Sequence, residues 1–284
     1  MLSLISMLIG CGDGLTLPPG WTVVEATAFQ RQHEAEIATP TGPLSSVASY
    51  YVGPGQALVL GVVEGAVVPV PVQEPGQAGP PGSRVRIEVT DAGARCLEGC
   101  GPGAVALTER REVSLDRFTL GLSPQSGTLR ILVHDPRAPA LAGFTGLPWF
   151  PVDPRFIVPA RWEPDPQRPT VELSTSRGLH KTFVQAGVLR ARVGGEDLAL
   201  VGYSSGASGA LLVPLTDATT GVKTYPVGRY LQVTVPPQGP AVLDFNRLTN
   251  PWCAYSEHYN CPVPPSANRL TLAVEAGEQV DATH

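Results

Sequence analysis

The feature that most constrains the fold is the density of glycine and proline. The chain has 284 residues, of which 31 are glycine and 30 are proline. Proline cannot donate a backbone hydrogen bond and glycine favours turns, so residues at this density divide the chain into short segments. We therefore expect few helices, and the apolar runs between the turns predict short β-strands.

Length and composition predict two folded domains. Domains usually contain about 100 to 200 residues, so 284 residues favour two. Hydrophobic residues make up 43% and charged residues 16%, unlike a disordered polyelectrolyte. The net charge is -5 and no run of lysine or arginine supplies a basic stripe, so nucleic acid is not an expected partner.

One segment predicts a helix. Residues 21–40 have helical spacing, with Phe29 and Ile37 on one face, and Pro40 ends the pattern. We expect residues 30–36 to supply the solvent-facing side of this helix.

The remaining apolar runs predict two series of strands. Residues 84–89 alternate between polar and apolar side chains, which is typical of an antiparallel strand with one buried face. In the first series, we also expect strands at residues 57–63, 67–72, 113–122 and 129–134. The second series runs from Thr170 to Val274. The predicted fold is mainly β, with two sandwich-like or barrel-like units and one short N-terminal helix.

A proline-rich segment with interleaved aromatic residues separates the two series. Prolines keep such a segment extended while its aromatic rings can bury a large area, so we expect a connector packed between the β units. An exposed aromatic platform for sugars is the alternative. The predicted organisation is a leader and tether at 1–20, an N-terminal domain at 21–134, this connector at 135–166, and a C-terminal domain at 167–284.

The N-terminus has the pattern of a lipoprotein signal. An apolar run leads to Leu8-Ile9-Gly10-Cys11, and it is too short for the roughly 20 residues that a membrane-spanning helix needs. No lysine or arginine precedes Cys11, so an apolar strand remains the alternative. We predict lipidation at Cys11, and hence a membrane partner and a place in the bacterial cell envelope.

The other four cysteines form two close pairs. Cys96 and Cys100 are four residues apart, and Cys253 and Cys261 are eight apart. An even number in an oxidising compartment predicts disulfides. Local pairing is the simplest connectivity, but spacing leaves the other pairings open.

The C-terminal part carries a recognisable signature. It includes DFNRLTNPWCAYSEHYNCPVPPSANRL from Asp244 to Leu270 and LTDATTGVKTYPVGRYL from Leu215 to Leu231. This pattern resembles the family called domain of unknown function 1684, here a bacterial member of the lipoprotein type. The resemblance implies a fold and a candidate site, but no reaction.

The signature contains the candidate site residues. We predict a binding or scaffolding module whose pocket for a small polar or glycan-like ligand is lined by Asp217, Tyr225, Arg229, Asp244, Asn246, Asn250 and His258. An alternative for the carboxylates and hydroxyls is that they cap turns. Purely structural packing in an envelope assembly is a third possibility.

An enzyme is the competing class. A hydrolase would use His258 with Asp244, and with Tyr225 as a further candidate. Cys253, His258 and Cys261 offer three zinc ligands, with Asp244 as a fourth, but the spacing lacks the paired C-x2-C signature. Our main prediction is that no cofactor is bound and that Cys253 and Cys261 form a disulfide instead.

Overall fold

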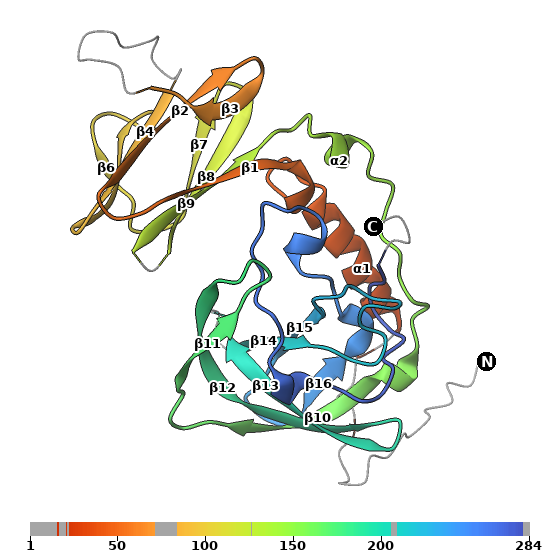
Figure 1. Ribbon diagram of the computed structural model, residues 1–284. Helices are drawn as coiled ribbons and strands as arrows, with labels where there is room; N and C mark the ends of the chain where they lie inside the picture. Colours follow the sequence, from red (N-terminus) through yellow and green to blue (C-terminus); the bar gives the residue numbers. More distant parts are fainter. Residues whose placement is uncertain are drawn as a thin grey trace. The chain divides into compact units, whose positions relative to one another are not determined.

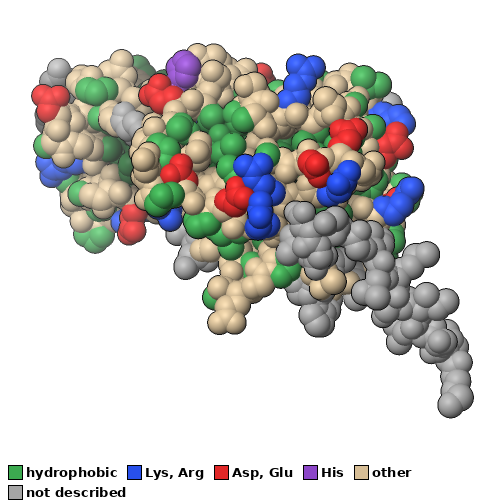
Figure 2. Space-filling view, turned by 90° about the horizontal axis from the view of Figure 1, so that it is seen from below, with side chains coloured by type: hydrophobic (Ala, Val, Ile, Leu, Met, Phe, Trp, Pro, Cys, Tyr) green, Lys and Arg blue, Asp and Glu red, His purple; other side chains and the backbone are tan. Residues whose placement is uncertain are grey.

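The computed structural model describes residues 16, 21, 23–71, 84–125, 127–205 and 209–280. The predicted lipidation site, Cys11, lies outside these residues. No helix in the described part is long and apolar enough to cross a membrane. On the face drawn in Figure 2, basic and acidic side chains are interspersed and do not gather by sign.

The chain divides into two compact units, shown in Figure 1. One unit, the barrel unit, comprises Met1–Glu34, Gly146–Tyr255 and Asn260–His284. The other, the sandwich unit, comprises Ala35–Thr145 and Ser256–Tyr259. Both are built almost entirely from antiparallel strands, which confirms the predicted mainly-β fold.

The sandwich unit contains two sheets. The first has the order β1-β9-β8-β7, with bounds Ser46–Val52, Thr128–His134, Phe118–Gln125 and Arg111–Leu115. The second has the order β3-β2-β4-β5-β6, with bounds Ala66–Pro69, Gln56–Val63, Arg84–Thr90, Gly93–Glu98 and Val105–Ala106. Apolar residues of both sheets share one core. In β4, Val85, Ile87 and Val89 are buried while the intervening residues are partly exposed, as the alternation predicts.

The predicted strand at 113–122 is two strands. β7 and β8 form a hairpin in which Leu115 pairs with Phe118. Asp116 occupies the turn with a φ of 54°, a left-handed conformation that aspartate tolerates better than most residues. The sequence did not reveal this turn, because Asp116 and Arg117 are the only polar residues at the centre of an otherwise largely apolar run.

The barrel unit is built on a nearly closed sheet with the order β15-β14-β13-β12-β10-β16, and β11 pairs with β12. In chain order the bounds are β10 Ile157–Pro164, β11 Thr170–Ser174, β12 His180–Val193, β13 Glu196–Ser204, β14 Ala210–Leu215, β15 Arg229–Thr234 and β16 Ala241–Asp244. The first and last strands of this order also contact each other. A second apolar core lies inside the sheet. The predicted strand at the C-terminal end, residues 269–274, is instead irregular.

Helix α1, Val23–Ile37, confirms the predicted N-terminal helix, but its buried face differs from the expected one. The buried positions are Ala26, Gln30, His33 and Ile37. Gln30 donates to the carbonyl of Asn246 at 3.2 Å, and polar partners of this kind allow polar side chains to be buried. The expectation that residues 30–36 all face solvent was therefore wrong.

The unit boundaries also differ from the predicted ones. Most of α1 belongs to the barrel unit, since the first segment of that unit extends to Glu34. The predicted connector is divided at Gly146, and its second half contributes strand β10, which pairs with β12 and β16. Three of its aromatic and proline residues, Pro159, Trp162 and Pro164, thus occupy strand positions in a sheet.

Candidate functional site

Asp217 and Arg229 form a fully buried ion pair in the barrel unit. Nη2 of Arg229 donates to Oδ2 of Asp217 at 2.9 Å, and both side chains are 0% exposed. Arg229 also donates to the carbonyl oxygens of Val274, Ala276 and Glu278. Burial lowers the pKa of Arg229, while the neighbouring carboxylate of Asp217 opposes that change.

The other oxygen of Asp217 is also occupied. It accepts from the backbone N–H and the hydroxyl of Thr219 at 2.7 and 2.6 Å, and from the backbone of Val274 at 3.3 Å. Asp217 and Arg229 therefore hold the C-terminal segment against the start of β15. Of their side-chain polar atoms, only Nε of Arg229 lacks a hydrogen-bond partner among the described residues. Because both side chains are fully buried, a ligand could not reach them without breaking the fold.

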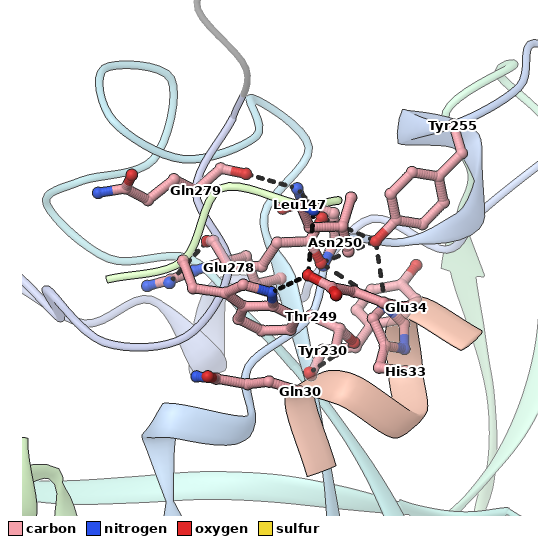
Figure 3. A network of polar contacts seen from close by, with 12 residues as sticks. Gln30, His33, Glu34, Leu147, Tyr230, Thr249, Asn250, Tyr255, Glu278 and Gln279 are labelled. Atoms are coloured by element: carbon pink, nitrogen blue, oxygen red, sulfur yellow. Dashed lines mark hydrogen bonds and ion pairs between the residues drawn. The ribbon is translucent and has the colours of Figure 1, made fainter. Parts of the chain in front are cut away.

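A second buried polar cluster is centred on Glu278 (Figure 3). Its carboxylate accepts from the backbone N–H and the side-chain amide of Asn250, both at 2.8 Å. The hydroxyl of Tyr255 lies 2.7 and 2.8 Å from the two carboxylate oxygens, and Nε2 of His33 lies 3.1 Å from that hydroxyl. Burial and the adjacent carboxylate raise the pKa of Tyr255 well above its usual range, which keeps the phenol protonated.

The Glu278 cluster connects helix α1 to the C-terminal segment that contains Glu278. His33 comes from the helix and also lies edge-on to the ring of Trp149 at 6.0 Å. Glu34, the next residue, accepts from the indole N–H of Trp149 at 2.8 Å and from the backbone of Leu147 at 3.1 Å. Glu278 is only 1% exposed, so the carboxylate at the centre of the cluster is shielded from solvent and has a structural role.

Asp244 and Asn246 cap the short helix that follows β16. The Asp244 carboxylate accepts from the backbone and side-chain amides of Asn246, at 3.1 and 3.0 Å. Asn246 also bonds both backbone groups of Asp153. Burial raises the pKa of Asp244, which opposes the role of a base that must stay ionised.

The members of the predicted catalytic set belong to different units. Asp244 and Tyr225 belong to the barrel unit, whereas His258 belongs to the four-residue segment of the sandwich unit. Tyr225 donates to the carbonyl of Cys253 at 3.1 Å, and burial beside the Cys253 thiol raises its pKa to about 12. Within the described residues, no three His, Cys, Asp or Glu side chains form a metal-binding group, so the zinc alternative has no assembled site.

The two cysteine pairs differ. Cys96 and Cys100 are joined by a disulfide with a Cα–Cα separation of 6.1 Å, as predicted. Cys253 and Cys261 are both unbonded thiols, so the predicted second disulfide is absent from the structure. The backbone N–H of Cys253 donates to Sγ of Cys261 at 3.1 Å, which places that sulfur beside Cys253.

An open cavity lies where strands β10, β13 and β15 end and β14 begins. It measures about 550 Å³, and we call it the mouth cavity. Its polar and aromatic lining comprises Trp162, Asp165, Arg168 and Ser204, and apolar side chains including Leu211 and Val235 complete the wall. A volume of this size is typical of ligand pockets, which often occur at the mouths of β-barrels.

Local backbone features shape the mouth cavity. The pairing of β12 with β13 shifts register between Gln185 and Gly187, a bulge that places Ala186 in the cavity wall. Gly187 has a φ of 154°, and a Cβ atom there would lie 2.7 Å from the ring of Trp162. The missing side chain lets Trp162 lie against β12. Bulges commonly redirect side chains beside functional sites.

The turn that follows β10 is the other special part of the mouth cavity. The Asp165 carboxylate accepts from the backbone of Gln167 at 2.9 Å, and the backbone of Arg168 donates to the carbonyl of Asp165 at 3.3 Å. Arg168 has a φ of 44°, which is uncommon for a residue with a long side chain. Its exposed guanidinium lines the cavity.

A smaller cavity of about 410 Å³ is lined mainly by the segment that the sequence predicted to be a connector. Phe150, Asp153, Arg155 and Phe156 line it together with Glu275. Arg155 is already paired with Asp153 at 2.6 Å. Because Arg155 and Asp153 already bind each other, this cavity offers fewer unpaired polar groups than the mouth cavity.

The comparison with known families matches the unit that contains these features. A family model described as "Protein of unknown function (DUF1684)" matches residues 142–279. Residues 142–279 belong to the DUF1684 family. The match confirms the resemblance drawn from the segments at 215–231 and 244–270.

One similar solved structure is that of an uncharacterized protein of Haloarcula marismortui, determined in solution by NMR. It is 34% identical, the alignment covers 50% of this chain and 80% of that chain, and the TM-score is 0.43. None of the curated proteins matches this chain.

The residues of the DUF1684 signature therefore form internal bonds that stabilise the fold. Asp217 with Arg229, Asp244 with Asn246, and Asn250 with Glu278 bond one another or nearby backbone. Sequence reasoning missed Glu278 because it lies in an irregular segment, 245 positions after its neighbour His33. It missed the mouth cavity too, although the Pro164-Asp165-Pro166 turn signal was visible in the sequence.

Proposed function

We propose that this protein is a lipid-anchored envelope protein whose DUF1684 unit is a binding module for a small polar or glycan-like ligand. The observation that carries the binding function is the mouth cavity. The anchor rests on the sequence pattern that ends at Cys11. The proposed ligand site is the mouth cavity, because most of the residues first expected to bind a ligand are buried and bonded to other residues of the protein.

The lining of the mouth cavity fits such a ligand. The indole of Trp162 offers an apolar face, on which the C–H face of a sugar ring can stack. Asp165 can accept and Arg168 and Ser204 can donate hydrogen bonds to hydroxyl groups. A left-handed residue at Arg168 costs conformational energy, and such strain is found preferentially at functional sites.

A thermal-shift screen with neutral oligosaccharides tests the binding function. A ligand present at about 100 times its Kd stabilises the native state by about 2.7 kcal/mol. We expect the shift to be lost in Arg168→Met and Trp162→Ala and kept in Arg155→Met, because Arg155 lines the smaller cavity. If Arg155→Met abolishes the shift and Arg168→Met does not, the mouth cavity is not the site.

The anchor has a separate test. Cys11→Ser should move the protein from the membrane fraction to the soluble fraction when it is expressed in a bacterium that processes lipoproteins. Unchanged membrane association would refute the anchor and would leave the binding function untouched.

A further inference from the structure

The Cys253 and Cys261 thiols form an asymmetric pair in the barrel unit. Cys261 is 6% exposed, whereas Cys253 is partly exposed. The two residues are eight positions apart, on either side of the segment that belongs to the sandwich unit. Cys253 is thus the more exposed residue of the pair.

The surroundings of Cys253 favour its thiolate. The neighbouring side chain of Cys261, with smaller contributions from Ser176 and Tyr225, lowers the pKa of Cys253 to about 7 in spite of burial. The neighbouring Cys253 and burial raise the pKa of Cys261, so the buried sulfur keeps its proton. A thiol with a lowered pKa and a protonated thiol beside it are the two parts that thiol–disulfide exchange requires.

A frame of backbone hydrogen bonds holds the pair in place. The backbone of Cys261 donates to the Ser176 hydroxyl at 3.2 Å, and the backbone of Ser176 donates to the Cys261 carbonyl at 2.8 Å. Lys181 donates to the carbonyl of Asn260 at 2.5 Å, and its charge favours ionisation of Cys261. Together with the bond from the backbone N–H of Cys253 to Sγ of Cys261, these contacts hold the two unbonded cysteines beside each other.

We propose that Cys253 and Cys261 form a site of thiol–disulfide exchange, with Cys253 as the attacking thiol and Cys261 as the resolving thiol. The co-substrate is a disulfide, R–S–S–R. The Cys253 thiolate attacks one of its sulfurs, the S–S bond breaks, and the first RS⁻ leaves and takes up a proton. Cys261 then loses its proton and attacks Sγ of Cys253, which forms the Cys253–Cys261 disulfide and releases the second RS⁻. Two thiols are oxidised to one disulfide, and R–S–S–R is reduced to two RSH.

The test uses glutathione disulfide as the probe and intact-mass measurement with peptide mapping as the readout. All proteins are full-length and carry Cys11→Ser, so that the fifth cysteine does not react. The Cys96–Cys100 disulfide is the internal reference and should stay bonded throughout. We expect the reduced protein to lose two hydrogens and retain no glutathione.

Single variants separate the two roles. Cys261→Ser should accumulate one glutathione on Cys253, since the resolving thiol is gone. Cys253→Ser should react at Cys261 at least about tenfold more slowly, because that thiol is buried and protonated. Ser176→Ala should slow the reaction of Cys253 about two- to threefold without changing the product.

Three results would overturn the proposal. Absence of any glutathione on Cys253 in Cys261→Ser would exclude the attack. Equal reaction rates of the two single variants would exclude the assigned roles. A Cys253–Cys261 disulfide that excess dithiothreitol does not open in the folded protein would make the pair a structural crosslink. Circular dichroism of each variant, with Cys253→Ala and Cys261→Ala as smaller replacements, separates these results from misfolding.

Discussion

The barrel unit contains two polar regions that differ in structure. Around Asp217, Arg229 and Glu278, every charged group is matched by an internal partner and excluded from water. Around Arg168 and Asp165, charged groups line an open cavity. The difference shows that crowding of polar residues in a sequence marks where a fold needs internal bonds, whereas a ligand needs polar groups that the fold has left available.

The largest effect that separates the two regions should come from Arg229. Arg229→Met removes one partner of a fully buried ion pair and leaves the Asp217 charge uncompensated. We expect a loss of about 3–5 kcal/mol in the free energy of unfolding. All four tryptophans belong to the barrel unit, so urea unfolding followed by tryptophan fluorescence reports on this unit. A loss below about 1 kcal/mol would mean that water reaches the pair.

A smaller effect is expected at the Glu278 cluster. Tyr255→Phe removes one hydroxyl that donates to the buried carboxylate, while Asn250 keeps both of its bonds. Hydrogen bonds to charged groups contribute about 1.5–3 kcal/mol, so we expect a loss of about 2 kcal/mol by the same measurement. Tyr51→Phe is the control for an exposed hydroxyl, and its unfolding is followed by circular dichroism because Tyr51 lies in the sandwich unit, outside the unit that holds the tryptophans. Tyr51 is 41% exposed, so the change should alter stability by less than about 0.5 kcal/mol. Equal effects of the two variants would show that the hydroxyl of Tyr255 carries no special role.

Sequence reasoning recovered the fold class because its signals are local. The alternation in residues 84–89 and the turns around it are read from neighbouring residues, and the structure confirms them as β4. Asp217 and Arg229 were expected to line one pocket, and the structure does bring them together, 2.9 Å apart. Their burial as an ion pair was not expected, because it depends on Val274 and Ala276, which come from the far end of the chain.

The buried face of α1 shows the same limit from the other side. Gln30 and His33 read as solvent-facing positions, since polar residues on a helix usually are. Their partners, Asn246 and Tyr255, lie more than 200 positions away. No periodicity within the helix encodes such a contact, so the sequence alone could place the helix and could not orient it.

The smallest effect on stability should come from Arg168, and it sharpens the comparison most. Arg168→Met makes the same replacement as Arg229→Met, but its guanidinium is exposed in the mouth cavity. The backbone strain at φ 44° is kept, so the free energy of unfolding should change by less than about 0.5 kcal/mol. A large loss would show that Arg168 stabilises the turn after β10, and the mouth cavity would then be part of the structural framework. A negligible loss of stability in a variant that no longer binds oligosaccharide would separate binding from stability within one unit. The same substitution would then destabilise the fold at Arg229 and abolish ligand binding at Arg168.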